Sequence, residues 1–243
     1  CLTGHEQEVH GVAISPDGNR IVFRGRTKDA AALYGRSLES EEAAPIRGTE
    51  DGIDPAFSPD GESIVFCAAG KLRRVAFGGG TPVDLADDAG CRGTAWGNDG
   101  TIVFSPSVNS ELWSVPAGGG TAKPLTTLND GAGERTHRWP GISPDGKTVF
   151  FTVGTRDKPG DYDDARIDAV PIHGGPRQVV YRGASFFRCI GQGDYLLARA
   201  GDLLRAHAAS GGAIRDAPVP VVRGLGGDPR SGVAFVSAAK NGT

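Results

Sequence analysis

One turn-and-strand motif recurs along the chain. It appears as ISPDGNRIVF at residues 14–23, FSPDGESIVF at 57–66, WGNDGTIVF at 96–104 and ISPDGKTVFF at 142–151. In SPDG the proline presets φ for a turn, the aspartate can bond the backbone two residues on, and the glycine accepts a positive φ. Short apolar runs with strand-like alternation flank each turn. Each copy therefore predicts two short strands joined by a tight hairpin.

The spacing of these hairpins predicts the architecture. The corner glycines are separated by 43, 39, 46, 47 and 49 residues, at Gly18, Gly61, Gly100, Gly146, Gly193 and Gly242. A third strand, a glycine-rich turn and a fourth strand follow within each period, as in ELWSVPAGGGTAKPLTTL. A repeat of about 40 to 50 residues with four strands is the signature of a propeller blade. We therefore predict an all-β fold, a β-propeller of four-stranded antiparallel blades.

The number of blades follows from the same register. The chain contains five complete repeats and part of a sixth, so we expect a six-bladed ring within one domain over residues 1–243, with its closure left open. The expected blades are residues 9–50, 51–90, 91–134, 135–183 and 184–229, with residues 230–243 and 1–8 contributing to the sixth.

Composition limits the partners of this chain. The 26 Lys and Arg residues are balanced by 29 Asp and Glu residues, which argues against a nucleic-acid partner. No apolar run is long enough to insert in a membrane. The chain has no methionine and begins at Cys1, so we expect either a fragment or a mature lipoprotein. Cys67, Cys91 and Cys189 show no CxxC spacing, and their disulfide state is left open.

The repeats resemble the TolB-like family of WD-repeat-related β-propellers. The similarity rests on the SPDG corners and on stretches such as GKLRRVAFGGGTPVDLAD and FTVGTRDKPGDYDDARIDA. The match is closest to the C-terminal propeller of bacterial serine/threonine protein kinases, although the kinase motifs themselves are absent. This resemblance implies a sensor or scaffold that lies outside the cytoplasm, in the periplasm or at the cell surface.

No catalytic motif occurs in the sequence. It contains no GxSxG elbow, and HEQEVH at residues 5–10 lacks the HExxH spacing. We therefore expect a non-enzymatic module that binds a protein or a small anionic or peptidic ligand. Two alternatives are the substrate-gating propeller of a prolyl oligopeptidase-type hydrolase and a Tol-system-like periplasmic interaction protein. A propeller enzyme using His10 and His137 is a further hypothesis, for which the acid and histidine residues are sparse.

The candidate ligand site follows from propeller geometry. Residues six to eight positions before a corner glycine are expected where the chain enters the central channel. Arginine offers a planar fork for carboxylate or phosphate, and a neighbouring aromatic ring can hold an apolar or cationic group. The predicted ligand-binding residues at these positions or near them on the same rim are His10, Asp54, Arg92, Arg135, His137, Arg138, Trp139 and Arg188.

An acidic loop at residues 155–165 is expected on the same rim. Its carboxylates are hard oxygen ligands, so calcium is a candidate ion and no other cofactor is expected, although the spacing is not that of an EF-hand. The candidate metal ligands are Asp161, Asp163 and Asp164. The competing interpretation is structural, because aspartates in such loops commonly cap turns and nearby arginines commonly form ion pairs between blades.

Overall fold

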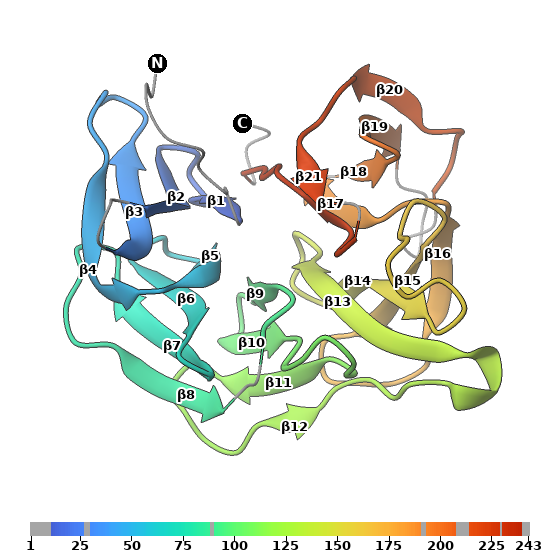
Figure 1. Ribbon diagram of the computed structural model, residues 1–243, viewed down its shortest axis with the longest axis horizontal. Coiled ribbons are helices and arrows are strands. Elements are labelled where there is room, and N and C mark those ends of the chain that lie inside the picture. Colours follow the sequence, from blue (N-terminus) through green and yellow to red (C-terminus); the bar gives the residue numbers. More distant parts are fainter. Residues whose placement is uncertain are drawn as a thin grey trace.

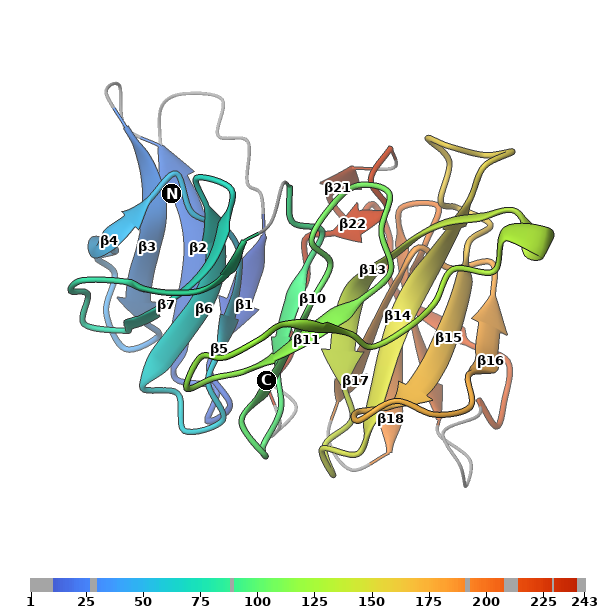
Figure 2. The same ribbon diagram turned by 90° about the horizontal axis from the view of Figure 1, so that it is seen from below.

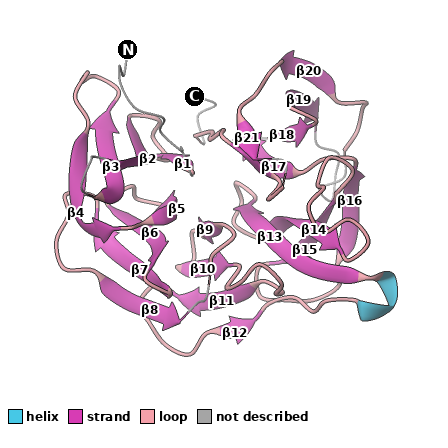
Figure 3. Ribbon diagram, in the orientation of Figure 1, coloured by secondary structure: helices cyan, strands magenta, loops and turns pink. Residues whose placement is uncertain are grey.

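The computed structural model describes residues 11–26, 30–87, 90–190, 193–207, 214–228 and 230–239. Apart from one turn of 3-10 helix at Asp130–Ala132, the regular structure in these residues is entirely β-strand (Figure 3). No helix in the described part of the chain is long and apolar enough to cross a membrane. The all-β prediction is confirmed.

Five four-stranded antiparallel sheets form a ring, and their strands follow the order of the sequence (Figure 1). The first blade is β1 (Val12–Ile14), β2 (Arg20–Arg26), β3 (Ala31–Ser37) and β4 (Ala44–Glu50). The second is β5 (Ile53–Phe57), β6 (Ser63–Ala68), β7 (Lys71–Ala76) and β8 (Val83–Asp87). The third is β9 (Thr94–Trp96), β10 (Thr101–Phe104), β11 (Trp113–Pro116) and β12 (Lys123–Pro124).

The remaining strands form two more complete blades and a partial one. The fourth blade is β13 (Glu134–Ile142), β14 (Thr148–Thr155), β15 (Arg166–Pro171) and β16 (Gln178–Arg182). The fifth is β17 (Phe186–Ile190), β18 (Asp194–Arg199), β19 (Asp202–His207) and β20 (Val219–Val222). A two-stranded sheet of β21 (Gly227–Asp228) and β22 (Val233–Ala234) occupies the position of a partial sixth blade. Residues 1–8 and Gly242, which were expected to contribute there, lie outside the described residues.

The first strand of each blade lies nearest the centre of the ring, and the strands run between its two faces (Figures 1 and 2). The face that carries the SPDG turns is called the corner face below, and the other is called the opposite face. Neighbouring blades are held together by apolar side chains. Between the first two blades, for example, Val22 and Leu33 pack with Ile64 and Phe66, and all four are inaccessible to solvent.

The hairpin corners are built by the residues that the motif prescribes. Gly18 has a φ of 78° and donates from its amide to the Ser15 carbonyl at 2.9 Å. The Ser15 hydroxyl in turn accepts from the Arg20 amide at 2.9 Å, and Asp17 accepts from the Asn19 amide at 3.1 Å. Gly61, Gly100 and Gly146 adopt the same positive φ and the same turn bond. The fifth corner differs, because Gly193 does not share the positive φ.

One disulfide connects adjacent blades. Cys67, in β6, is bonded to Cys91, which precedes β9, with Cα atoms 6.1 Å apart. Both residues are buried within the apolar cluster between the second and third blades. Cys189 is a free thiol, and burial raises its pKa to about 12. The cross-link therefore ties two repeats that are otherwise joined by packing and by the connecting chain.

Candidate functional site

Three connected cavities form a channel along the axis of the ring. A cavity of about 180 Å³ opens on the corner face, and one of about 230 Å³ lies towards the opposite face. Between them is a constriction of only about 30 Å³. Arg188 and Thr94 line both the corner cavity and the constriction, whereas Asp54 and Trp139 line both the constriction and the opposite cavity. The middle of the channel therefore has much less free volume than either end.

The constriction is formed by equivalent positions of the repeat. The residue seven places before each corner glycine lies at this level, contributed in turn by the five blades as Gly11, Asp54, Gly93, Trp139 and Phe186. Asp54 and Trp139 have positive φ values of 50° and 53°, which are uncommon for residues with a side chain. Both lie at irregularities in strand pairing, where β5 and β13 each depart from regular register. The backbone of β5 and of β13 is therefore bent at this level of the ring.

Hydrogen bonds hold this bent backbone. The Asp54 carboxylate accepts from the Gly93 amide at 3.1 Å, which links the second and third blades. The Trp139 indole donates to the Ser231 carbonyl at 2.8 Å, and its amide donates to the Arg92 carbonyl at 2.8 Å. These bonds compensate an unfavourable backbone conformation, so the constriction is a fixed feature of the scaffold.

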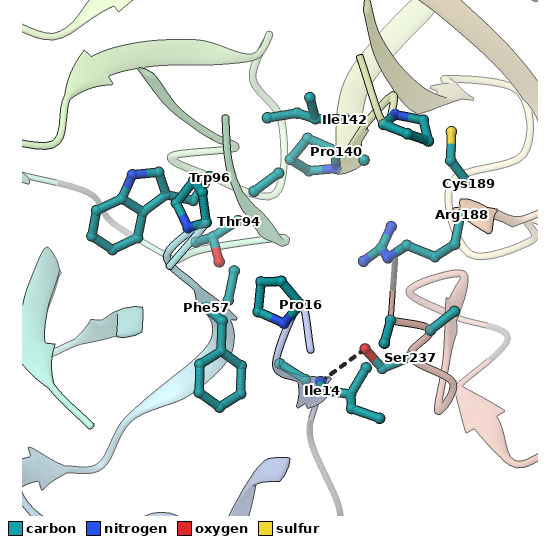
Figure 4. Close-up of a pocket in the computed structure, with 18 of the residues that line it drawn as sticks. Ile14, Pro16, Phe57, Thr94, Trp96, Pro140, Ile142, Arg188, Cys189 and Ser237 are labelled. Atoms are coloured by element: carbon teal, nitrogen blue, oxygen red, sulfur yellow. Dashed lines mark hydrogen bonds between the residues drawn. The ribbon is translucent and has the colours of Figure 1, made fainter. Parts of the chain in front are cut away.

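Arg188 reaches the channel from β17. Its side chain extends towards the middle of the ring at the inner end of the corner cavity (Figure 4). The guanidinium carbon lies 4.1 Å from the centre of the Phe186 ring, and Nη1 donates to the Phe187 carbonyl at 2.9 Å and to the Trp139 carbonyl at 3.4 Å. Burial lowers the pKa of Arg188 to about 10, which still leaves it charged at neutral pH. Among the described residues, no carboxylate forms an ion pair with this guanidinium.

The walls of the corner cavity combine apolar side chains with polar groups. Their aliphatic and aromatic side chains come from the first strands of four blades and surround the space in front of Arg188 (Figure 4). Ser237 completes the wall and accepts a hydrogen bond from the Ile14 amide at 3.1 Å. The apolar lining side chains include Ile14, Pro16, Phe57, Trp96, Pro140 and Ile142. A concave site that combines apolar walls with a few placed polar groups is the usual form of a ligand site.

The opposite cavity has a mixed charge. It is lined by Arg24 and Arg92 together with Asp54 and Asp228. Arg92 donates to the Cys91 carbonyl at 2.7 Å, and Asp228 accepts from the Arg230 amide at 3.0 Å. The two acids offset the two arginines, so this end has no uniform preference for anions.

Four of the residues predicted for ligand binding line the channel, namely Asp54, Arg92, Trp139 and Arg188. His10 lies outside the described residues. Arg135, His137 and Arg138 were expected on the same rim, but none of them lines these three cavities. That expectation is corrected accordingly, and ligand binding by any of these residues stays a prediction.

Arg138 lies between structural elements. Its Nη1 donates to the Ser231 carbonyl at 3.0 Å and its Nη2 to the Val108 carbonyl at 2.9 Å, while its guanidinium stacks 4.5 Å from the centre of the Tyr162 ring. The residue is only 2% exposed. Nη2 of Arg135 donates to the hydroxyl of this same tyrosine, Tyr162, at 2.8 Å. Both arginines therefore brace the loops around the fourth blade.

We expect Arg138→Ala to lower the free energy of unfolding by about 2 kcal/mol. Two charge-assisted hydrogen bonds are worth about 3 to 6 kcal/mol together. Burial lowers the pKa of Arg138 to about 10, so keeping this charge in the folded protein costs free energy. The substitution recovers that cost, which reduces the net loss to about 2 kcal/mol. Urea denaturation followed by tryptophan fluorescence measures the difference. The exposed Arg182→Ala serves as the control and should change stability by less than about 0.5 kcal/mol; an equal effect of both variants would contradict the bracing role.

His137 belongs to a buried polar network. It is completely buried, with Nδ1 2.8 Å from the Thr126 hydroxyl and Nε2 3.2 Å from Glu134. Burial lowers the pKa of His137, although Glu134 partly opposes this. Thr126 also accepts from the Leu112 amide at 2.9 Å, as Thr49 accepts from the Leu33 amide in the first blade. The repetition indicates that a threonine near the end of the fourth strand of a blade connects this segment to a residue in the third strand or just before it. In the third blade, that threonine is also contacted by His137 of β13.

The carboxylates of the acidic loop have local partners. Asp161 accepts from the Asp163 amide at 3.1 Å, and Asp164 pairs with Lys158 at 3.2 Å. In the ranges that the structure describes, no group of three or more His, Cys, Asp or Glu side chains is placed to hold a metal ion. The arrangement follows the structural interpretation of the loop, in which aspartates cap turns.

Comparison with solved structures identifies the type of propeller. The chain matches a putative TolB from Agrobacterium tumefaciens with a TM-score of 0.64 and 17% identity, over 86% of this chain and 80% of that one. It matches TolB from Acinetobacter baumannii with a TM-score of 0.68 and 15% identity, over 90% of this chain and 55% of that one. The chain has the TolB-like β-propeller fold. The TolB-like resemblance inferred from the repeats is thereby confirmed, whereas the closer resemblance to kinase-associated propellers stays a prediction.

Other comparisons extend beyond TolB-like proteins. An oligogalacturonate lyase in complex with manganese shares the fold, with a TM-score of 0.61 and 14% identity over 88% of this chain and 65% of that one. A Bacillus subtilis (strain 168) protein described as "Uncharacterized peptidase YuxL" is 32% identical over 142 residues, which are 57% of this chain. The aligned part is only 21% of that protein's length. No protein-family model matches this TolB-like chain.

Proposed function

We propose that this chain is a non-catalytic binding module that holds an apolar segment of a protein or peptide partner in the corner cavity. The observation that carries the proposal is the shape of the channel: a cavity of about 180 Å³ with apolar side chains in its walls opens on the corner face and ends at a constriction of about 30 Å³. Such a cavity accepts a segment from one side and stops it.

The walls of this cavity are fixed before any partner binds. Pro16 and Pro140 lie beside strands whose register is set by the hairpins, and proline locks its own φ. A rigid receptor loses little conformational entropy on binding, which favours recognition of a short segment. The ring thus supplies a receptor surface on which apolar side chains bury the partner and polar groups can orient it.

The disulfide supports a location outside the cytoplasm. Disulfides persist in oxidising compartments and are uncommon in the cytosol. The Cys67–Cys91 bond is consistent with the periplasmic or cell-surface location that the TolB-like resemblance implies. A partner in the same compartment, such as another envelope protein, is the expected class.

We expect Ile142→Glu to weaken the binding of apolar peptides at least roughly tenfold, because it places a charge in the wall of an apolar site. Short random peptides displayed on phage would be selected against the wild-type chain, and the affinities of the selected peptides measured by fluorescence anisotropy. Val179→Glu is the control, since Val179 is 49% exposed and lies on β16 outside the channel. Selected peptides that bind Ile142→Glu as tightly as the wild type would contradict the proposed site.

A peptidase-associated propeller is the second candidate, favoured by the 32% identity to YuxL. In that role the channel would admit substrate to a separate hydrolase domain. The constriction argues against passage of a polypeptide through the ring in this conformation. The peptidase hypothesis predicts that the product of the complete gene hydrolyses peptidyl nitroanilides, whereas the binding-module hypothesis predicts no turnover.

A further inference from the structure

Arg188 is a partly exposed charged group at the inner end of the corner cavity. Its guanidinium is stacked on Phe186, and both apolar and polar groups line the cavity around it. A charge that is partly withdrawn from water is stabilised by an acidic partner. Within the described ranges no acid forms an ion pair with Arg188, although Asp54 attracts it electrostatically from across the constriction. Among the residues that the structure describes, the guanidinium therefore has no counter-ion at hydrogen-bonding distance.

The hydrogen bonds of Arg188 leave one edge of the guanidinium unused. Nη1 donates to the Phe187 and Trp139 carbonyls, which fixes the plane of the group. Nη2 and Nε make no hydrogen bond with any described residue, and together they form a two-pronged donor edge. A carboxylate matches such an edge with two parallel hydrogen bonds.

The neighbouring thiol does not neutralise this charge. Cys189 also lines the corner cavity, but burial raises its pKa to about 12, so it remains a neutral thiol at physiological pH. The charge on Arg188 is therefore available to a ligand that enters the cavity.

The shape of the channel selects the position of the carboxylate within the ligand. A polypeptide entering from the corner face meets Arg188 just before the constriction, where the free volume falls to about 30 Å³. A chain that stops there presents its end. The carboxylate at the C-terminus of a polypeptide is then the group that reaches Arg188, and the preceding apolar side chains contact Ile14, Trp96 and Ile142.

We propose that the corner cavity is a receptor for the C-terminus of a polypeptide, in which Arg188 holds the terminal carboxylate and the cavity walls hold the preceding apolar residues. This inference rests on the proposed function, because it names the class of ligand for the same cavity.

The test compares two pools of fluorescein-labelled pentapeptides with random apolar residues at their last three positions. The pools differ only at the C-terminus, which is a free carboxylate in one and an amide in the other. Fluorescence anisotropy should show that the wild-type chain binds the free-acid pool at least tenfold more tightly than the amide pool. In Arg188→Gln this preference should disappear. Arg182→Gln, which removes an exposed charge on β16, should retain it.

The outcomes separate this inference from the proposed function. Equal affinity of the two pools for the wild type, with binding of both lost in Ile142→Glu, would retain the apolar receptor and overturn the role of the terminal carboxylate. A free-acid preference that persists in Arg188→Gln would also overturn it. A third pool, amidated and with one internal glutamate, serves as a further comparison. If it binds more strongly than the free-acid pool, Arg188 holds a side-chain carboxylate instead and the role of the terminal carboxylate is overturned. Binding of neither of the first two pools would overturn both proposals. The comparison on the wild type needs no variant, so a folding defect in Arg188→Gln does not obscure the result.

Discussion

Replacing Glu134 with alanine is expected to lower the free energy of unfolding by about 4 kcal/mol, because removing one partner of a buried ion pair strands the others. Glu134 is completely buried at the start of β13. Arg177 donates to its two oxygens at 2.7 and 2.9 Å, the Asn129 amide donates at 2.8 Å, and Arg166 forms a further ion pair. After the substitution, Asp168 is the remaining acid for both arginines.

An exposed ion pair of the same blade is the matched control. Asp130 pairs with Arg156, and their side chains are 78% and 56% exposed. Solvent screens such pairs, so Asp130→Ala should cost less than about 1 kcal/mol. Chemical denaturation of both variants at pH 7 gives the comparison. Similar losses in the two variants would mean that the buried network stabilises the fold no more than an exposed ion pair does.

The same network predicts acid sensitivity. Burial alone would raise the pKa of Glu134, but its hydrogen bonds with His137, Arg177, Asn129 and Arg166 outweigh burial and lower it well below its ordinary 4.5. The resulting stability is present above pH 4.5 and is lost as the pH falls towards the lowered folded-state pKa. His137 adds in the same direction, because burial lowers its pKa below 6.5 and the unfolded chain takes up the proton first. We expect the unfolding free energy to fall between pH 7 and about 4.5 through His137, and to fall further between about pH 4.5 and 2 through Glu134. The second part of this fall should be smaller in Glu134→Ala, when both chains are titrated by chemical denaturation.

Breaking the disulfide is expected to lower the unfolding free energy by about 3 kcal/mol. Cys67 and Cys91 are 24 residues apart in sequence, and a cross-link closing a loop of this length restricts the unfolded chain by about that amount. The bond also joins two blades, so its loss should loosen the ring between β6 and β9. Thermal and urea denaturation with and without reductant measure the change.

Two controls separate the cross-link from packing. The double variant Cys67→Ala and Cys91→Ala loses buried sulfur as well as the bond, but its stability should not respond to reductant. Cys189→Ala keeps the disulfide and should respond as the wild type does. If the unfolding transition of the wild type is unchanged by complete reduction, the bond is not a determinant of stability.

The fold could be predicted because each hairpin is determined locally. In SPDG the serine, aspartate and glycine bond to backbone groups within five residues, as at Ser15, Asp17 and Gly18, so the sequence alone implies the turn. The period then implies the blade. The Gly193 and Gly242 corners lack the SPDG sequence; Gly242 lies outside the described residues, and Gly193 does not share the positive φ of the other described corners.

The site was harder to predict because neighbouring residues point in different directions. Arg138 and Trp139 both fell within the window expected at the channel, yet Trp139 lines the constriction and Arg138 is buried between loops. The difference arises from the irregular register of β13 between Arg138 and Gly141, which local sequence does not reveal. The corner cavity was not predicted at all. Its apolar lining from four blades has the alternation of ordinary core strands, and only the position of Arg188 among them was a signal.

The ring of residues seven places before each corner has a consequence for how this scaffold can diverge. A side chain at Gly93 would approach the Trp139 backbone to 2.9 Å, and Gly11 has a φ of 78°, so these two blades cannot accept larger residues there without displacement or strain. Asp54, Trp139 and Phe186 remain as the positions at which the bore of the channel can vary. Paralogues built on this repeat could change what the channel admits through three substitutions, each remote from the hairpin that folds its blade. In this scaffold, selectivity and foldability are encoded at separate places within the same repeat.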